Sequence, residues 1–116
     1  MKRKLSEAQT WLQLYLSERY GHRAKVLPEL RFCDTRKWRF DVGVLQDFQC
    51  EPEIRLGFEI EGGLFMAGTG RHNRGAGMRK DMEKYNTAAA LGWKVFRFTP
   101  EQILKGEAKA FIERYL

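Results

Sequence analysis

Two segments of the chain alternate apolar and polar residues over lengths typical of β-strands. Residues 38–44 read WRFDVGV, and residues 54–61 read IRLGFEIE. Since successive side chains of a strand point to opposite faces, each segment predicts a strand with one apolar face. Such a face must be covered, so we expect a sheet packed against helices.

Helical periodicity elsewhere supplies the covering elements. A capping-box pattern at Ser6 opens a helix that ends at Gly21. A second helix, ending at Gly92, is predicted to bury a face formed by Met78, Met82, Tyr85 and Ala89. Thr99 begins a third helix, and the tail 107–116 is also expected to be helical.

Shorter strands at 30–33 and 93–98 complete the pattern. The order is then helix, three strands, helix, strand and helix, which describes a mixed central sheet flanked by helices. With 116 residues, of which 43% are hydrophobic, the chain has room for one core. We therefore expect a single α/β domain spanning 1–116.

Charge and cysteine content narrow the function classes. The formal net charge of +6 favours nucleic acid or another polyanion as partner. Cys33 and Cys50 are far apart and belong to no CxxC pattern, which argues against a structural zinc site. No segment has the pattern of a signal peptide or of a membrane span, so we expect a cytoplasmic protein without a membrane partner.

Three acidic residues fall on the polar faces of the predicted strands. Glu59 and Glu61 share one strand face about 7 Å apart, and Asp41 on the preceding strand is expected to join them. Converging carboxylates repel and raise each other's pKa unless a cation lies between them. Hard oxygen ligands suit Mg²⁺ or Mn²⁺, so we expect the metal-binding positions to be Asp41, Glu59, Ile60 and Glu61.

The segment 62–80 follows the acidic strand directly and contains six glycines and no acidic residue. Its cations could form an ordinary solvated face, but the lack of neighbouring acids favours phosphate contacts. We expect the DNA-binding residues to be Arg71, Arg74, Arg79 and Lys80. A metal site beside a basic surface is the arrangement that phosphodiester hydrolysis needs.

The order of elements, with Asp41 on the second strand and Glu59 on the third, resembles the PD-(D/E)XK nuclease superfamily over residues 5–98. The strings WRFD, FEIEGG, GRH and GWKVFRFT are similar to small phage and bacterial proteins of its very-short-patch-repair endonuclease-like branch. The resemblance implies a restriction endonuclease-like core, with Asp41 and Glu59 as metal ligands and Glu18 on the first helix as a supporting carboxylate.

The superfamily's signature lysine would fall at position 61, where this chain has Glu61. Two compensations are open. In the repair-endonuclease-like branch an acidic residue followed by glycine and then histidine is familiar, which favours His72 as a proton donor or acceptor. A displaced lysine is the other, and Lys84 on the second helix is the candidate. Glu61 would then act as a metal ligand or as a base that orients water.

These features predict a Mg²⁺- or Mn²⁺-dependent DNA endonuclease. The small size favours cutting guided by substrate structure, by a homodimer or by a partner protein over sequence-specific cutting. The alternative is a non-catalytic nucleic-acid-binding module on a nuclease-like fold, which the missing lysine keeps open. A ribonuclease or a Holliday-junction resolvase fits the same residues.

Overall fold

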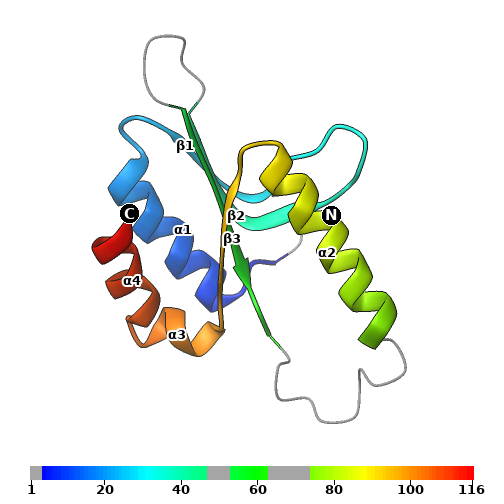
Figure 1. The fold of residues 1–116 in the computed structure, drawn as a ribbon. Coiled ribbons are helices and arrows are strands. Elements are labelled where there is room, and N and C mark those ends of the chain that lie inside the picture. Colours follow the sequence, from blue (N-terminus) through cyan, green and yellow to red (C-terminus); the bar gives the residue numbers. More distant parts are fainter. Residues whose placement is uncertain (1–3, 47–52, 63–73) are drawn as a thin grey trace.

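The computed structural model describes residues 4–46, 53–62 and 74–116, with side chains in the last range described from residue 77 onward. It is a small α/β structure with a mixed four-strand sheet flanked by helices (Figure 1). The elements in order are α1 (Glu7–Tyr20), β1 (Lys25–Arg31), β2 (Arg39–Gln46), β3 (Ile54–Ile60), α2 (Arg74–Ala90), β4 (Lys94–Phe98), α3 (Pro100–Leu104) and α4 (Glu107–Tyr115).

The sheet has the strand order β1-β2-β3-β4. The first three strands pair antiparallel, whereas β4 pairs parallel to β3. A parallel pair needs a crossover connection, and α2 lies within this one. Phe58 in the middle of β3 stands opposite Val42 of β2 and Phe96 of β4.

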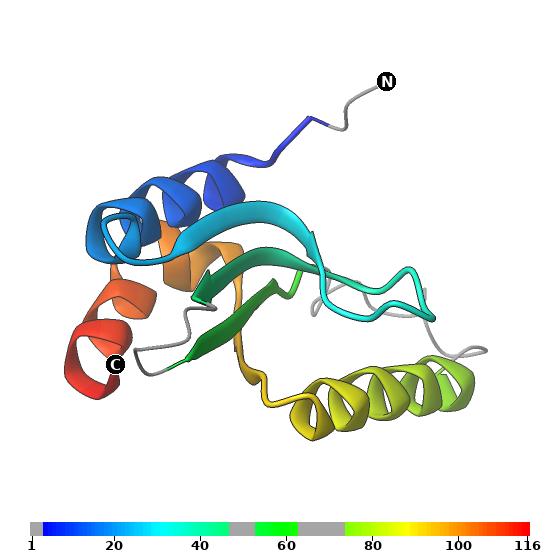
Figure 2. The ribbon, with the colours of Figure 1, turned by 90° about the horizontal axis from the view of Figure 1, so that it is seen from above.

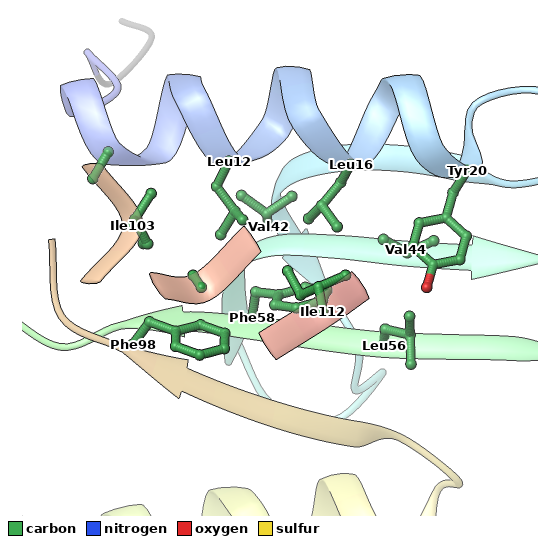
Figure 3. Packing of buried hydrophobic residues seen from close by; sticks show 12 residues of the cluster. Leu12, Leu16, Tyr20, Val42, Val44, Leu56, Phe58, Phe98, Ile103 and Ile112 are labelled. Carbon is green, nitrogen blue, oxygen red and sulfur yellow. The ribbon is translucent and has the colours of Figure 1, made fainter. Parts of the chain in front are cut away.

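Helices α1, α3 and α4 cover one face of the sheet (Figure 2). Leu12 and Leu16 of α1 point toward β2, while Ile103 of α3 and Ile112 of α4 close the same core from the side (Figure 3). The sheet contributes the apolar side chains of Val42, Val44, Leu56, Phe58 and Phe98. Among the described residues, this is the larger of two clusters of buried side chains.

Helix α2 lies on the opposite face, over a small cluster of Phe40, Ala88 and Trp93. Two glycines, Gly43 of β2 and Gly57 of β3, are paired on this face of the sheet and leave space for larger side chains. A Cβ added to Gly57 would lie 2.7 Å from the ring of Phe40, and one added to Gly43 would lie 2.1 Å from the Leu30 side chain. Without these side chains, Phe40 and Leu30 lie close against the sheet.

The helix starts follow the predicted capping chemistry. Ser6 Oγ accepts the N–H of Gln9 at 3.1 Å, and Thr99 and Gln102 form a complete capping box at α3. Among the described residues, no helix has the length and apolar character needed to cross a membrane.

Two predicted elements differ in their bounds. The strand expected at 30–33 is β1 and begins at Lys25, where the chain pairs with β2 earlier than its irregular pattern suggests. Helix α2 begins at Arg74, inside the glycine-rich segment 62–80. Helical spacing within a glycine-rich segment gives little signal of a helix start.

The predicted buried face of α2 is wrong. Met78 and Met82 are 53% and 56% exposed, Ala89 is exposed, and Tyr85 is only half-buried. Among the side chains described in α2, Ala88 alone is buried, because the helix touches the sheet near its C-terminal end. Periodicity identified the helix but not the stripe that packs.

Candidate functional site

Asp41 lies where the regular alternation of β2 breaks. Phe40 packs under α2 while Val42 packs under α1, although alternation predicted both on one face. The regular pairing of β2 with β3 ends at Val42 and Phe58. Beyond this pair, Asp41 Oδ2 accepts the backbone N–H of Ile60 at 2.6 Å. A side-chain oxygen thus binds the β3 N–H where a main-chain carbonyl would otherwise do so. The Asp41 carboxylate is therefore held against β3, beside Glu59.

Glu59 projects from β3 toward α2 and is 8% exposed. Its Oε1 accepts a hydrogen bond from Lys84 Nζ, forming an ion pair. Burial raises the pKa of Glu59 to about 7; the Lys84 ammonium opposes this shift and the neighbouring Asp41 charge adds to it. The carboxyl is therefore easily protonated unless more positive charge is present.

Lys84 reaches the sheet because of its position on α2. It lies one turn before Ala88, and residues four apart share a helix face. Ala88 is the α2 side chain that packs against Phe40 and Trp93, so the same face carries Lys84 toward Glu59. The Lys84 side chain is 17% exposed, and its Nζ lies 5.6 Å from the Tyr85 ring centroid.

Glu61 takes a different partner from the one expected. Arg97 Nε of β4 donates to Glu61 Oε1 at 2.6 Å, and the guanidinium carbon lies 4.8 Å from the Tyr85 ring centroid. Within the described ranges, no group of three or more histidine, cysteine and acidic side chains is placed to hold a metal ion. The structure brings Asp41 and Glu59 together, whereas Glu61 is paired with Arg97.

A buried glutamine supports Asp41 from the other side of the sheet. Gln9 of α1 is 6% exposed, and its Nε2 donates to the backbone oxygen of Asp41 at 2.8 Å and to Glu29 Oε1 at 3.2 Å. Glu29, on β1, has a φ of 53°, in the left-handed region. Such backbone is strained for a residue with a side chain and persists where the surroundings enforce it.

The remaining predicted residues are distributed as follows. Glu18 is exposed near the end of α1, about 13 Å along the helix axis from Gln9 at about 1.5 Å per residue. The residue of α1 that contacts Asp41 is therefore Gln9. Arg79 and Lys80 are exposed on α2, and Arg74 is its first residue. Arg71 and His72 lie outside the described residues.

Three residues beside Asp41 and Glu59 were not predicted from the sequence. Arg97 had a usable signal, since it alternates with Phe96 and Phe98 and so faces the same side as its pairing partner Glu59. Gln9, three residues after Ser6, has in the sequence only the signal of the capping box, and nothing in the sequence indicates the backbone conformation of Glu29.

Asp41, Glu59 and Lys84 therefore come together from β2, β3 and α2 to form a compact charged group, hereafter the acid–lysine cluster. Comparison of the chain with protein-family models, with curated proteins and with solved structures finds no match. The geometry of the described residues is the ground for assigning a function.

Proposed function

We propose that the chain is a Mg²⁺- or Mn²⁺-dependent DNA endonuclease with a PD-(D/E)XK nuclease core. The observation that carries the proposal is the acid–lysine cluster. Asp41 and Glu59 are the two acidic residues of the superfamily's signature, and Lys84 lies in ion-pair contact with Glu59. The described order α1, β1, β2, β3, α2, β4 also agrees with the order that the resemblance implies.

The donor set fits a hard divalent cation. Asp41 and Glu59 would hold it, because their carboxylates adjoin and a cation would favour the charged form of Glu59, whose pKa is raised by burial. When bound, such a cation supplies positive charge to phosphoryl oxygens and lowers the pKa of a coordinated water. The hydrogen bond from Ile60 N–H fixes the orientation of the Asp41 carboxylate.

Lys84 would replace the signature lysine that is absent at position 61. Its ammonium reaches Glu59 from α2, so it provides a fixed positive charge at the place where a scissile phosphate would lie. His72 remains the second candidate for this compensation on the ground of the sequence pattern alone.

The surface around the cluster suits a polyanion. Arg79 and Lys80 are exposed on α2, the helix that carries Lys84. Together with the net charge of +6, they support phosphate contacts that position DNA independently of sequence.

One observation favours the rival function, a non-catalytic DNA-binding module. The Lys84–Glu59 pair partly neutralises the buried carboxylate without any metal, as a purely structural ion pair would. In that case DNA binding would need no divalent cation, and loss of Asp41 would leave the affinity unchanged.

Cleavage assays on duplex, nicked, branched and single-stranded DNA, with Mg²⁺, Mn²⁺ or EDTA, separate these functions. We expect metal-dependent cleavage that Asp41→Asn abolishes and Lys84→Met reduces about 10²-fold or more. Lys105→Met is the matched control, because Lys105 pairs with Glu101 on the exposed surface of α3. Binding without cleavage in every metal would establish the binding module instead.

A further inference from the structure

A groove runs between α2 and β4 next to the acid–lysine cluster. It has a volume of about 660 Å³, and its walls include Met78, Met82, Tyr85 and Asn86 of α2 and Arg97 of β4. This volume lies within the range of sites that hold small molecules.

The apolar wall of the groove has no role in the core. Met78 and Met82 lie one turn apart and are each more than half exposed, and Ala88 is the one buried side chain among those described in α2. Exposed apolar side chains that gather at one place mark binding surfaces. Thioether side chains adapt to flat apolar partners, and the adjoining Tyr85 ring adds an aromatic surface.

The polar groups of the groove limit what can occupy it. Asn86 offers both a donor and an acceptor, and Asp81 at the same wall offers acceptors only. The Arg97 guanidinium borders the groove, where it is paired with Glu61 and lies 4.8 Å from the Tyr85 ring centroid. The cations that remain exposed for an anionic group are Arg79 and Lys80 of α2. An apolar face, a hydrogen-bonding edge and a negative charge are together the features of a nucleotide, whose base stacks and whose edge and phosphate are polar.

The position of the groove ties it to the cluster. Arg97 is bonded to Glu61, the residue that follows β3 and lies two positions after Glu59, and Tyr85 directly follows Lys84. A nucleotide in the groove would therefore adjoin a phosphate held at the cluster. Within a duplex, both faces of a base are covered by its neighbours, so only an unpaired or extruded base can stack on these side chains.

We propose that this groove binds an unpaired nucleotide of the DNA strand that is cut. The inference rests on the proposed endonuclease function and specifies its substrate class: DNA with at least one unpaired nucleotide at the cleavage site. The exposed cations Arg79 and Lys80, on the same helix as the methionines, make a nucleic acid strand a better occupant than an apolar peptide.

The test compares a fully paired duplex with the same duplex carrying one unpaired 2-aminopurine nucleotide. Single-turnover cleavage by the wild type should favour the unpaired substrate by about 10-fold, the scale of one base stacked on an aromatic or apolar side chain. Met82→Glu and Asn86→Ala should remove this preference without slowing cleavage of the paired duplex. Met82→Leu should retain it, and Leu14→Glu, at a 63% exposed position on α1, is the charge-matched control.

The outcomes distinguish this inference from the endonuclease function. Cleavage of paired and unpaired DNA at equal rates would overturn the groove assignment and leave the endonuclease intact. If no DNA is cleaved, titrating the 2-aminopurine duplex with protein and following its fluorescence still tests whether the groove binds the unpaired nucleotide. Quenching by the wild type that Met82→Glu abolishes supports the groove, and equal quenching overturns it. Dimerisation that Met82→Glu abolishes would identify a second copy of the chain as the occupant and would also overturn it.

Discussion

The two faces of the sheet are built on different principles. The face under α1, α3 and α4 is closed by aliphatic and aromatic side chains from four strands and helices, many of them fully buried. The face under α2 has a small apolar cluster at one end and charged side chains along the rest, with Glu59–Lys84 and Glu61–Arg97 in sequence. Stability is concentrated on one face, and the groups capable of chemistry on the other.

The largest contrast should come from truncating one residue of the packed face. Leu12 is completely buried between α1 and the sheet, so Leu12→Ala should lower the free energy of unfolding by about 2–5 kcal/mol. Leu14→Ala, two positions along the same helix but 63% exposed, should change it by less than about 0.5 kcal/mol. Urea unfolding measures both. Equal losses would contradict the division between the faces.

The contribution of the α2 face to the free energy of unfolding should instead depend on pH. Burial raises the pKa of Glu59 from its ordinary value of 4.5 to about 7, so the folded state binds the proton more tightly than the unfolded state. This contribution to stability is complete below about pH 4.5 and is lost as the pH rises through about 7. The loss amounts to about 3 kcal/mol.

Urea unfolding in EDTA at a series of pH values checks this prediction. Glu59→Gln should remove the loss of stability between pH 5 and 8, and Glu101→Gln, at an exposed ion pair, should retain it. Added Mg²⁺ should flatten the wild-type dependence, because a bound cation favours the charged carboxylate. If the stability of the wild type and that of Glu59→Gln change in parallel with pH, burial does not raise the pKa of Glu59.

Gln9 connects the two faces and offers a smaller effect. Gln9→Ala leaves the Asp41 carbonyl and the Glu29 carboxylate without this donor, at a cost of about 1–3 kcal/mol. If Gln9 positions Asp41 for catalysis, kcat should fall while KM for DNA stays unchanged. Gln13→Ala, one turn along α1, is the control. An unchanged kcat in a destabilised Gln9→Ala would confine Gln9 to a structural role.

The smallest effect on stability should come from the Glu61–Arg97 pair. Arg97 is nearly half exposed, and surface pairs contribute about 0–1 kcal/mol. Glu61→Gln should therefore leave the melting temperature nearly unchanged while freeing Arg97 for phosphate, which raises DNA affinity and steepens its salt dependence. Fluorescence anisotropy over a range of salt concentrations measures both. A lower DNA affinity of Glu61→Gln would contradict this prediction and favour Glu61 as a metal ligand.

The packed face was largely predictable from sequence. Alternation identified β2 and β3, and capping patterns placed the starts of α1 and α3 within a residue of where they begin. These signals are local, since the strand period and the cap act within a few residues. The expectation that Asp41 joins Glu59 assumed regular alternation along β2, whereas Phe40 and Val42 pack on opposite faces of the sheet.

The α2 face was less predictable because its contacts are not local. Helical spacing shows that Met78 and Met82 share a stripe but not whether anything covers it. Glu61 pairs with Arg97 because β4 lies parallel beside β3, a pairing that neither residue's own segment encodes. Likewise, Lys84 meets Glu59 only because Ala88 sets the rotation of α2 about its axis.

Gly57 leaves the space that the Phe40 ring occupies between the sheet and Ala88 of α2. Phe40 is fully buried and its ring lies against Gly57, so even one methyl group at that position would displace the ring outward. The ring also packs against Ala88 of α2, the helix that carries Lys84. A single added carbon at Gly57 would thereby widen the separation between the Lys84 ammonium and the Glu59 carboxylate without altering either of them, so the charge geometry of this protein depends on a residue that has no side chain.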